Sequence, residues 1–294
     1  MPSGFLDHPR PIAFAHRGGA AHAPENSWRA FEHAVGLGYG YLETDLQATS
    51  DGVLLAFHDR TLGRVTGRTG RIARMPYREM SGALIGGTEP IPLLEDLLAA
   101  WPDIRFNIDL KDSPAIQPLA EVLRRTAAWD RVCVVSFSAS RLRAARRVFE
   151  RQVCMAASLI GTAVVRFGGP RDPRGPHRAG PRRAGPGRAG PGRGPIQAQL
   201  TLAQPRPERG PHGALAERLA RTGVRCAQLP ESVATESFVS RAHALGLQVH
   251  VWTVNDTAAM TSLLDIGVDG IMTDETVALR DLLICRGQWH PRPG

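Results

Sequence analysis

The chain has 294 residues, of which 43% are hydrophobic and 22% charged, an ordinary composition for a globular protein of one large or two small domains. Its formal charge of +8 suggests a nucleic-acid partner, but eight arginines against one aspartate between positions 166 and 193 account for almost all of it. The rest of the chain is nearly neutral, so we predict no specific nucleic-acid binding.

Apolar runs alternate with amphipathic stretches along most of the chain. A serine at position 27 caps the first helix, and Ser-Asp-Gly at 50–52 forms a turn between the second and third strands. In chain order, the predicted strands cover 12–16, 41–48, 52–59, 105–111, 132–138, 153–161, 225–230, 247–255 and 269–274, and the predicted helices cover 27–38, 93–101, 115–129, 140–150, 235–246 and 256–267.

This alternation is typical of a parallel sheet whose strands are covered by helices. With the hairpin at 41–59 counted apart, about eight strand–helix units are present. A (β/α)8 barrel uses about 250 residues, close to the length of this chain without its centre. We therefore predict an α/β protein, a (β/α)8 TIM barrel with a small β-hairpin insertion.

The centre of the chain interrupts the alternation. Residues 166–212 are rich in Arg, Gly and Pro, and such a sequence cannot bury enough apolar surface to fold, so we expect disorder there. A lineage-specific insert, a local frameshift in a GC-rich gene and a basic tether for an acidic partner are all compatible with it. The domain prediction is one barrel over 1–285, interrupted by 166–212, and a tail at 286–294.

The four cysteines show no Cys-x-x-Cys pair. Three of them lie in or beside apolar runs, so we expect buried, reduced thiols and a reducing compartment. No window approaches 18 consecutive apolar residues, and the first residues lack the pattern of a signal peptide. We therefore predict no membrane span and a cytoplasmic location.

Polar side chains occur where four of the predicted strands end, at positions that a core would reject. Because the carboxyl ends of barrel strands form one mouth, we expect these groups to converge there. They are His16 and Arg17, Glu43 and Asp45, His58 and Asp59, and Asp109 and Lys111.

Glu43 and Asp45 are two residues apart in one strand, so both side chains point to the same face, and so do Asp109 and Lys111. Carboxylates held this close repel one another unless a cation lies between them or one of them is protonated. Three carboxylates favour a hard divalent cation, Ca²⁺ or Mg²⁺, over zinc.

Lys111 is the single lysine in a chain with 35 arginines, which suggests that a compact ammonium is needed at this position. A metal, Lys111 and Arg17 at one mouth form a site for an anionic phosphoryl group. His16 and His58 can supply a general acid and a general base on either side of it. The residue types therefore predict phosphodiester cleavage.

Several motifs of the chain, in this order, resemble those of the glycerophosphodiester phosphodiesterase family. The resemblance covers about 12–160 and 225–285. It is carried by HRGGAAHAPENSWRAF, ETDLQATSDGVLLAFHD, RVTGRTG, IPLLEDLL, FNIDLK and VHVWTVND.

The resemblance implies a (β/α)8 barrel that uses a divalent metal to hydrolyse glycerophosphodiesters to an alcohol and sn-glycerol 3-phosphate. It also implies that His16 and His58 are the acid/base pair, that Arg17 and Lys111 bind phosphate, and that Glu43 and Asp45 are metal ligands. The third ligand is usually Glu in the family, and Asp109 at this position has a reach one methylene shorter.

Two further residues are weaker candidates for substrate binding. Asn26 would orient the site through its amide. Trp252, near the end of the strand at 247–255, would either wall the glycerol pocket or belong to the core. Two alternative functions remain open at this stage, a lysophospholipase D-like lipid phosphodiesterase and a catalytically impaired relative whose Arg-rich segment binds polyanions.

Overall fold

A computed structural model describes residues 4–157, 219 and 221–292 of the chain. The predicted disordered segment 166–212 lies outside these residues. The strands are β1 (Ile12–Ala15), β2 (Tyr41–Ala48), β3 (Leu54–Ala56), β4 (Leu84–Ile85), β5 (Glu89–Pro90), β6 (Arg105–Leu110), β7 (Val132–Val135), β8 (Cys154–Ala157), β9 (Val224–Pro230), β10 (Gln248–Trp252) and β11 (Gly270–Thr273). The α-helices are α1 (Trp28–Gly36), α2 (Gly63–Thr66), α3 (Tyr77–Met80), α4 (Leu94–Ala100), α5 (Ile116–Arg125), α6 (Ala139–Val148), α9 (Glu236–Ala244), α10 (Thr257–Asp265) and α11 (Thr276–Cys285).

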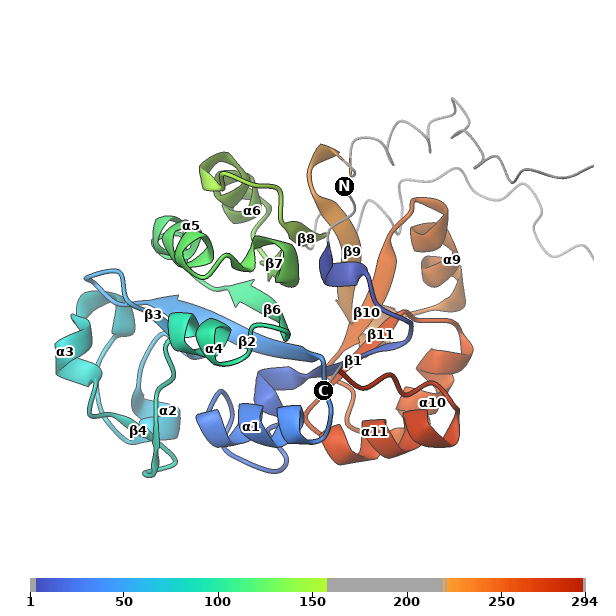
Figure 1. The fold of residues 1–294 in the computed structure, drawn as a ribbon, viewed down its shortest axis with the longest axis horizontal. Helices are drawn as coiled ribbons and strands as arrows, with labels where there is room; N and C mark the ends of the chain where they lie inside the picture. The colour runs from blue at the N-terminus through green and yellow to red at the C-terminus, as the bar shows by residue number, and fades with distance from the viewer. Residues whose placement is uncertain (1–3, 158–218, 220, 293–294) are drawn as a thin grey trace, which may run out of the picture.

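Eight parallel strands of the described residues close into a barrel, with helices around its outside (Figure 1). The strand order is β1, β11, β10, β9, β8, β7, β6 and β2, and pairing of β1 with β2 closes the ring. The predicted (β/α)8 barrel is therefore confirmed. The strand predicted at 225–230 is β9, which pairs with β8 on one side and β10 on the other.

Side chains two residues apart on each strand fill the inside of the barrel in successive layers. The layer toward the amino-terminal ends of the strands is apolar and contains Phe14 of β1, Tyr41 of β2 and Met272 of β11. The next inward positions of β2 are Glu43 and Asp45, both buried. Because every second residue of a strand faces the interior, the interior changes from an apolar layer at one end of the barrel to a polar layer at the other.

The outer layer is formed by helices that each bury one face against the strands. In α5, for example, Leu119, Ala120 and Leu123 face the barrel, while arginines end the helix. The predicted cap is present, since the Ser27 hydroxyl accepts a hydrogen bond from the Ala30 amide at the start of α1. The sequence pattern therefore fixes both the position and the inward face of these helices.

The insertion between β2 and β6 is larger than the predicted hairpin. Strand β3 pairs antiparallel with β2 as expected, but α2, α3, β4 and β5 follow before α4. Their apolar residues form a small core of their own, which includes Leu55, Phe57, Leu62, Ile72 and Met80. Each of these elements is only two to four residues long, too short for a periodic pattern to reveal.

The amino-terminal end of the barrel is covered by residues near both ends of the described chain. Phe5 packs on Tyr41, whose hydroxyl donates a hydrogen bond to the Phe5 carbonyl. Trp289, in the predicted tail, packs edge-on against Tyr39. These contacts exclude water from the apolar end of the interior.

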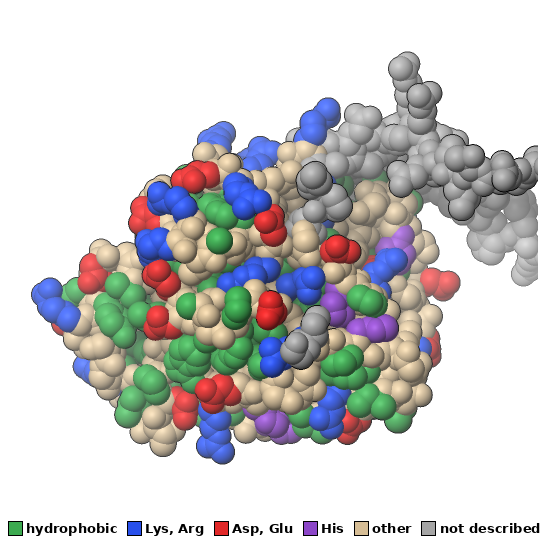
Figure 2. Space-filling view, viewed as in Figure 1, with side chains coloured by type: hydrophobic (Ala, Val, Ile, Leu, Met, Phe, Trp, Pro, Cys, Tyr) green, Lys and Arg blue, Asp and Glu red, His purple; other side chains and the backbone are tan. Residues whose placement is uncertain are grey.

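The surface of the barrel is mixed in charge. On the face shown in Figure 2, acidic and basic side chains are interspersed without a large area of one sign. Among the described helices, none has the length and apolar content needed to cross a bilayer.

We predict that Gly270→Ala lowers the free energy of unfolding by about 1–3 kcal/mol, the usual cost of overpacking. A Cβ at this position of β11 would lie 2.9 Å from Phe14 Cε2 and 3.0 Å from the Ile12 carbonyl oxygen. The matched control is Gly36→Ala at the end of α1, where a Cβ would meet nothing within 4 Å. Urea denaturation would measure both, and equal stability of the two variants would contradict this packing.

Candidate active site

A group of polar side chains lies at the carboxyl ends of the strands, around a cavity of about 180 Å³. The predicted catalytic, phosphate-binding and metal-ligating residues all line this cavity, as does Trp252. The lining residues are His16, Arg17, Glu43, Asp45, His58, Asn107, Asp109, Lys111, Val135, Ser136, Phe137, Gln228, Trp252, Thr253 and Met272.

A tight turn after β1 brings His16 and Arg17 to the cavity. Arg17 has a φ of 50°, an unusual left-handed conformation for a residue with a side chain. This conformation lets the Arg17 amide donate a 3.0 Å hydrogen bond to Glu43 Oε2. Gly18 follows with a φ of 86°, and a Cβ there would lie 2.7 Å from the Ala30 Cβ. Only glycine therefore permits the turn to pack this closely on α1.

Glu43 and Asp45 project from β2 into the cavity, as the i, i+2 spacing predicted. Burial and the neighbouring Asp45 charge raise the pKa of Glu43 to about 7. Burial acts in the same direction on Asp45, but the charges of Lys111 and Arg17 outweigh it and hold the pKa of Asp45 below its usual value. Neighbouring cations therefore balance the charge of Asp45 better than that of Glu43.

Lys111 lies between two of the carboxylates. Its Nζ is 2.8 Å from Asp45 Oδ1 and 2.6 Å from Asp109 Oδ2. The other oxygen of Asp109, Oδ1, is buried and has no hydrogen-bond partner. One side of Asp109 therefore offers an unused acceptor to the cavity.

Asn26 contacts Asp45 from the turn that precedes α1. Its Nδ2 donates a 3.1 Å hydrogen bond to Asp45 Oδ2, and its Oδ1 accepts one from the Thr44 hydroxyl. Asn26 does not line the cavity. Its hydrogen bond therefore reaches the site through the Asp45 carboxylate, and a role of Asn26 in substrate binding stays a prediction.

A carboxylate fixes the ring of His16 from behind. His16 Nδ1 lies 2.8 Å from Asp274 Oδ1, and Asn255 Nδ2 donates to the other Asp274 oxygen. Burial lowers the pKa of His16, but the Asp274 hydrogen bond and the Glu43 charge outweigh it, so the pKa is raised overall. The Asp274 bond occupies Nδ1 and leaves Nε2 for the cavity, where it lies 3.9 Å from Glu43 Oε2.

His58 is held in the same way on the other side of the site. Its Nδ1 lies 2.7 Å from Asp59 Oδ1, and Arg64 in turn binds both Asp59 and Glu25. The Arg64 hydrogen bond lowers the pKa of Asp59 to about 2, so this carboxylate stays ionised at neutral pH. The hairpin insertion therefore contributes a histidine with a fixed orientation.

Aromatic rings form one wall of the cavity. Trp252 packs edge-on against Phe137, with 5.7 Å between the ring centroids. Phe137 is 49% exposed, and Lys111 Nζ lies 6.0 Å above its ring. Of the two expectations for Trp252, the cavity wall is the one that its position supports.

The sequence analysis missed several residues of the site. Asn107 and Gln228 bond to each other at the bottom of the cavity, where Gln228 Nε2 donates a 2.8 Å hydrogen bond to Asn107 Oδ1. Asn107 lies two residues before Asp109, so the same alternation would have found it. Asp274 directly follows β11, and the rule that strand ends form the mouth would have found it too. Phe137 follows β7, but the rule selects polar residues at strand ends and so does not identify an apolar one.

The chain was compared with known families, proteins and structures. A sequence profile of the glycerophosphoryl diester phosphodiesterase family matches residues 16–159 and 199–278. A Mycobacterium tuberculosis protein described as probable glycerophosphodiester phosphodiesterase 2 is 40% identical over 97% of this chain and 95% of its own. A human lysophospholipase D is 24% identical over 92% of this chain and 85% of its own.

Solved structures share the fold. A putative glycerophosphoryl diester phosphodiesterase from Silicibacter pomeroyi has a TM-score of 0.70 at 22% identity, over 98% of this chain and 99% of that one. An Oleispira antarctica phosphodiesterase, solved with the product sn-glycerol-3-phosphate, has a TM-score of 0.67 at 21% identity, over 94% and 97% of the two chains.

We predict that Lys111→Met lowers the free energy of unfolding by about 3 kcal/mol, because it leaves the buried Asp45 and the partly buried Asp109 without their shared cation. The matched control is Arg124→Met, which removes an exposed ion pair with Glu150 and should cost less than about 1 kcal/mol. Both variants would be measured by urea denaturation in the presence of a chelator. A Lys111→Met protein as stable as the control would show that Lys111 does not balance these charges.

Proposed function

The chain belongs to the glycerophosphoryl diester phosphodiesterase family, and we propose that its cavity hydrolyses glycerophosphodiesters to an alcohol and sn-glycerol 3-phosphate. The observation that carries this proposal is the pair of oriented histidines at a cationic cavity. His16 and His58 are each held at Nδ1 by a carboxylate, and Arg17 and Lys111 line the space that they face. This arrangement suits in-line displacement at a phosphodiester.

The histidines would move the two protons of the reaction. One Nε2 takes a proton from the attacking water as its oxygen bonds to phosphorus, and the other gives a proton to the alcohol oxygen as its bond to phosphorus breaks. The carboxylates of Asp274 and Asp59 stabilise each imidazolium while it carries its proton. After the step the base histidine carries the proton from water and the acid histidine has lost its own, and proton exchange with solvent restores both.

Arg17 and Lys111 would bind the phosphate oxygens. Both cations are only partly exposed, and water screens them less than it screens cations on the open surface. Arg17 is held from both sides, with Nη1 3.1 Å from Glu25 Oε1 and Nε 3.0 Å from Asp45 Oδ2. Such fixed cations stabilise the charge that develops on phosphorus without reorganising.

Glu43, Asp45 and Asp109 would hold a divalent cation, Ca²⁺ or Mg²⁺. The unpartnered Asp109 Oδ1 and the raised pKa of Glu43 both indicate carboxylate charge that the protein does not balance by itself. All three donors are oxygens, which fits a hard cation. The cation would neutralise charge on the phosphoryl oxygens, and it would share the Asp45 and Asp109 carboxylates with Lys111.

A lysophospholipid is a second candidate substrate, which the exposed aromatic wall favours. Phe137 extends from the cavity lining to the surface beside Trp252 and offers an apolar approach that a small glycerophosphodiester does not need. A human lysophospholipase D is also among the relatives that match most of this chain.

The function would be tested by incubating the purified full chain with glycerophosphocholine and with lysophosphatidylcholine, and by identifying the products. Release of choline and glycerol 3-phosphate from the first supports the proposed reaction. Release of choline from lysophosphatidylcholine alone would favour the second candidate. No product from either substrate with Ca²⁺ or Mg²⁺ present would contradict both.

We predict that His16→Ala and His58→Ala each lower kcat by about 10²–10⁴, the range expected for the loss of one acid/base group. His290→Ala is the control, since His290 lies near His8 at the opposite end of the barrel. Steady-state kinetics with circular dichroism of each variant would test this. Near-normal rates in both active-site variants would remove the histidines from the mechanism.

We also predict that chelation of divalent cations abolishes turnover and lowers the melting temperature, because the three carboxylates then repel one another. Adding back Ca²⁺ or Mg²⁺ should restore turnover and raise the melting temperature above that of the chelated chain. The measurement is activity and thermal unfolding before and after EDTA. Full turnover in excess EDTA would contradict the proposed cation.

A further inference from the structure

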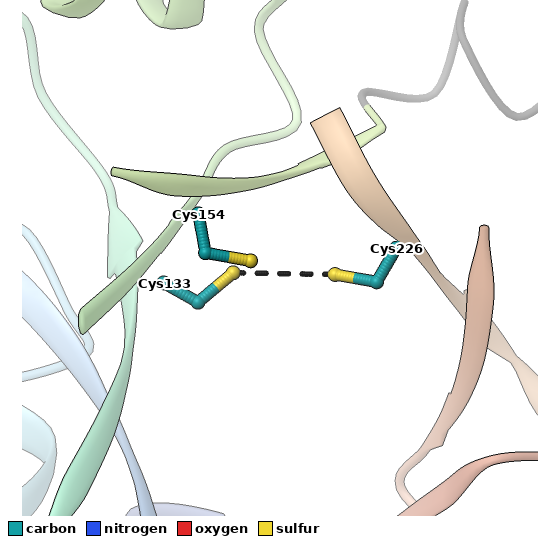
Figure 3. A group of neighbouring side chains, drawn as sticks. All are labelled: Cys133, Cys154 and Cys226. Atoms are coloured by element: carbon teal, nitrogen blue, oxygen red, sulfur yellow. Dashed lines mark hydrogen bonds between the residues drawn. The ribbon is translucent and has the colours of Figure 1, made fainter. Parts of the chain in front are cut away.

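Three cysteines meet inside the barrel, one layer below the cavity. Cys133 of β7, Cys154 of β8 and Cys226 of β9 are fully buried, and their sulfurs all lie within 4.8 Å of one another. Figure 3 shows the three side chains pointing toward a common centre, with 4.0 Å between the sulfurs of Cys133 and Cys226. Among the described residues, no other trio of His, Cys, Asp or Glu brings its ligand atoms this close.

The spacing of the sulfurs suits a tetrahedral metal. Zinc binds thiolates at about 2.3 Å, which separates two sulfurs of a tetrahedral site by about 3.8 Å. The observed spacing differs from this by tenths of an ångström to about 1 Å, so rotation of the side chains can close the site.

A fourth ligand lies beside the thiols. His250 of β10 is fully buried on the strand that pairs with β9, and its ring packs 4.9 Å from the ring of Phe14, which belongs to the same core cluster as the three cysteines. Its Nδ1 is buried without a hydrogen-bond partner, while Nε2 contacts Gln248 Oε1 at 3.1 Å. A buried ring nitrogen without a partner is costly, and a metal at this position would satisfy it.

We propose that Cys133, Cys154, Cys226 and His250 form a structural Zn²⁺ site that is separate from the carboxylate site of the cavity. Three thiolates and one imidazole are a ligand set that zinc prefers, and hard cations such as Ca²⁺ do not. Because zinc binds thiolates and not thiols, its binding releases the thiol protons.

The position of this site in the chain suggests its role. Cys154 lies on β8, the last described strand before residues 158–218, and Cys226 lies on β9, the first described strand after them. A metal clip that closes a long connection is expected to contribute more stability than one that closes a short loop. The zinc would hold β7, β8 and β9 together, although β8 and β9 are far apart in the sequence.

The cavity provides a path to the site. Gln228 Nε2 lies 3.9 Å from the Cys226 sulfur and bonds to Asn107, so this amide pair separates the cavity from the thiols. Rotation of Gln228 would open the way for the ion. Cation exchange at the thiols therefore passes the active site, although the two sites differ in ligand chemistry.

The test is titration of the reduced full chain with Co²⁺, which reports its ligands by colour. We expect one equivalent to produce a thiolate-to-cobalt charge-transfer band and intense tetrahedral d–d bands, and Zn²⁺ to displace both. Cobalt at the carboxylate site lacks the charge-transfer band, so the two sites are distinguishable. Zn²⁺ should also raise the melting temperature in excess Ca²⁺.

Matched variants decide the assignment. Cys226→Ser and Cys154→Ser should lose the charge-transfer band, whereas Cys285→Ser, which changes the exposed thiol, should keep it. His250→Gln should keep the band and bind cobalt more weakly, and this variant retains all three thiols if a serine variant fails to fold. A folded wild-type chain without the band, or a band that survives in folded Cys226→Ser, would overturn the proposal.

Discussion

Repulsion among carboxylates buried at one end of the barrel is the constraint on which the rest of the site depends. Strand geometry brings the buried Glu43 and Asp45 together with the partly buried Asp109, and the fold can hold them only if positive charge is placed among them or one carboxyl group is protonated. Lys111 and Arg17 supply part of that charge. The same cations are then available to bind a phosphodiester, so one arrangement serves both folding and the proposed reaction.

Because every second residue of a strand faces the interior, one strand can place different kinds of metal ligand at different depths of the barrel. On β9, for example, Cys226 lies in the buried core cluster, and Gln228, two residues later, lines the cavity. Oxygen ligands thus collect at the mouth, and sulfur ligands collect below. This separation would allow a hard and a soft cation to bind the same barrel without competing.

Much of this site was predictable from the sequence, because both the strand period and the mouth of a parallel barrel are regular. They identified Glu43, Asp45, Asp109 and Lys111 as neighbours from two separate strands, and β9 was recognised after a long interruption. The elements between β3 and α4 were not predicted, since pieces of two to four residues carry no periodic signal. The cysteine cluster was not predicted either, because sequence spacing does not reveal that three strands place their thiols at one level.

The most direct test of the central claim, that the acids at the mouth bind one divalent cation, is calorimetric titration of the metal-free chain with Ca²⁺. Thiolates do not compete for this ion. The account predicts one bound Ca²⁺ per chain in the wild type and in Cys226→Ser, and none in Glu43→Gln or Asp45→Asn. A wild-type chain that hydrolyses glycerophosphodiesters while binding no divalent cation would contradict it.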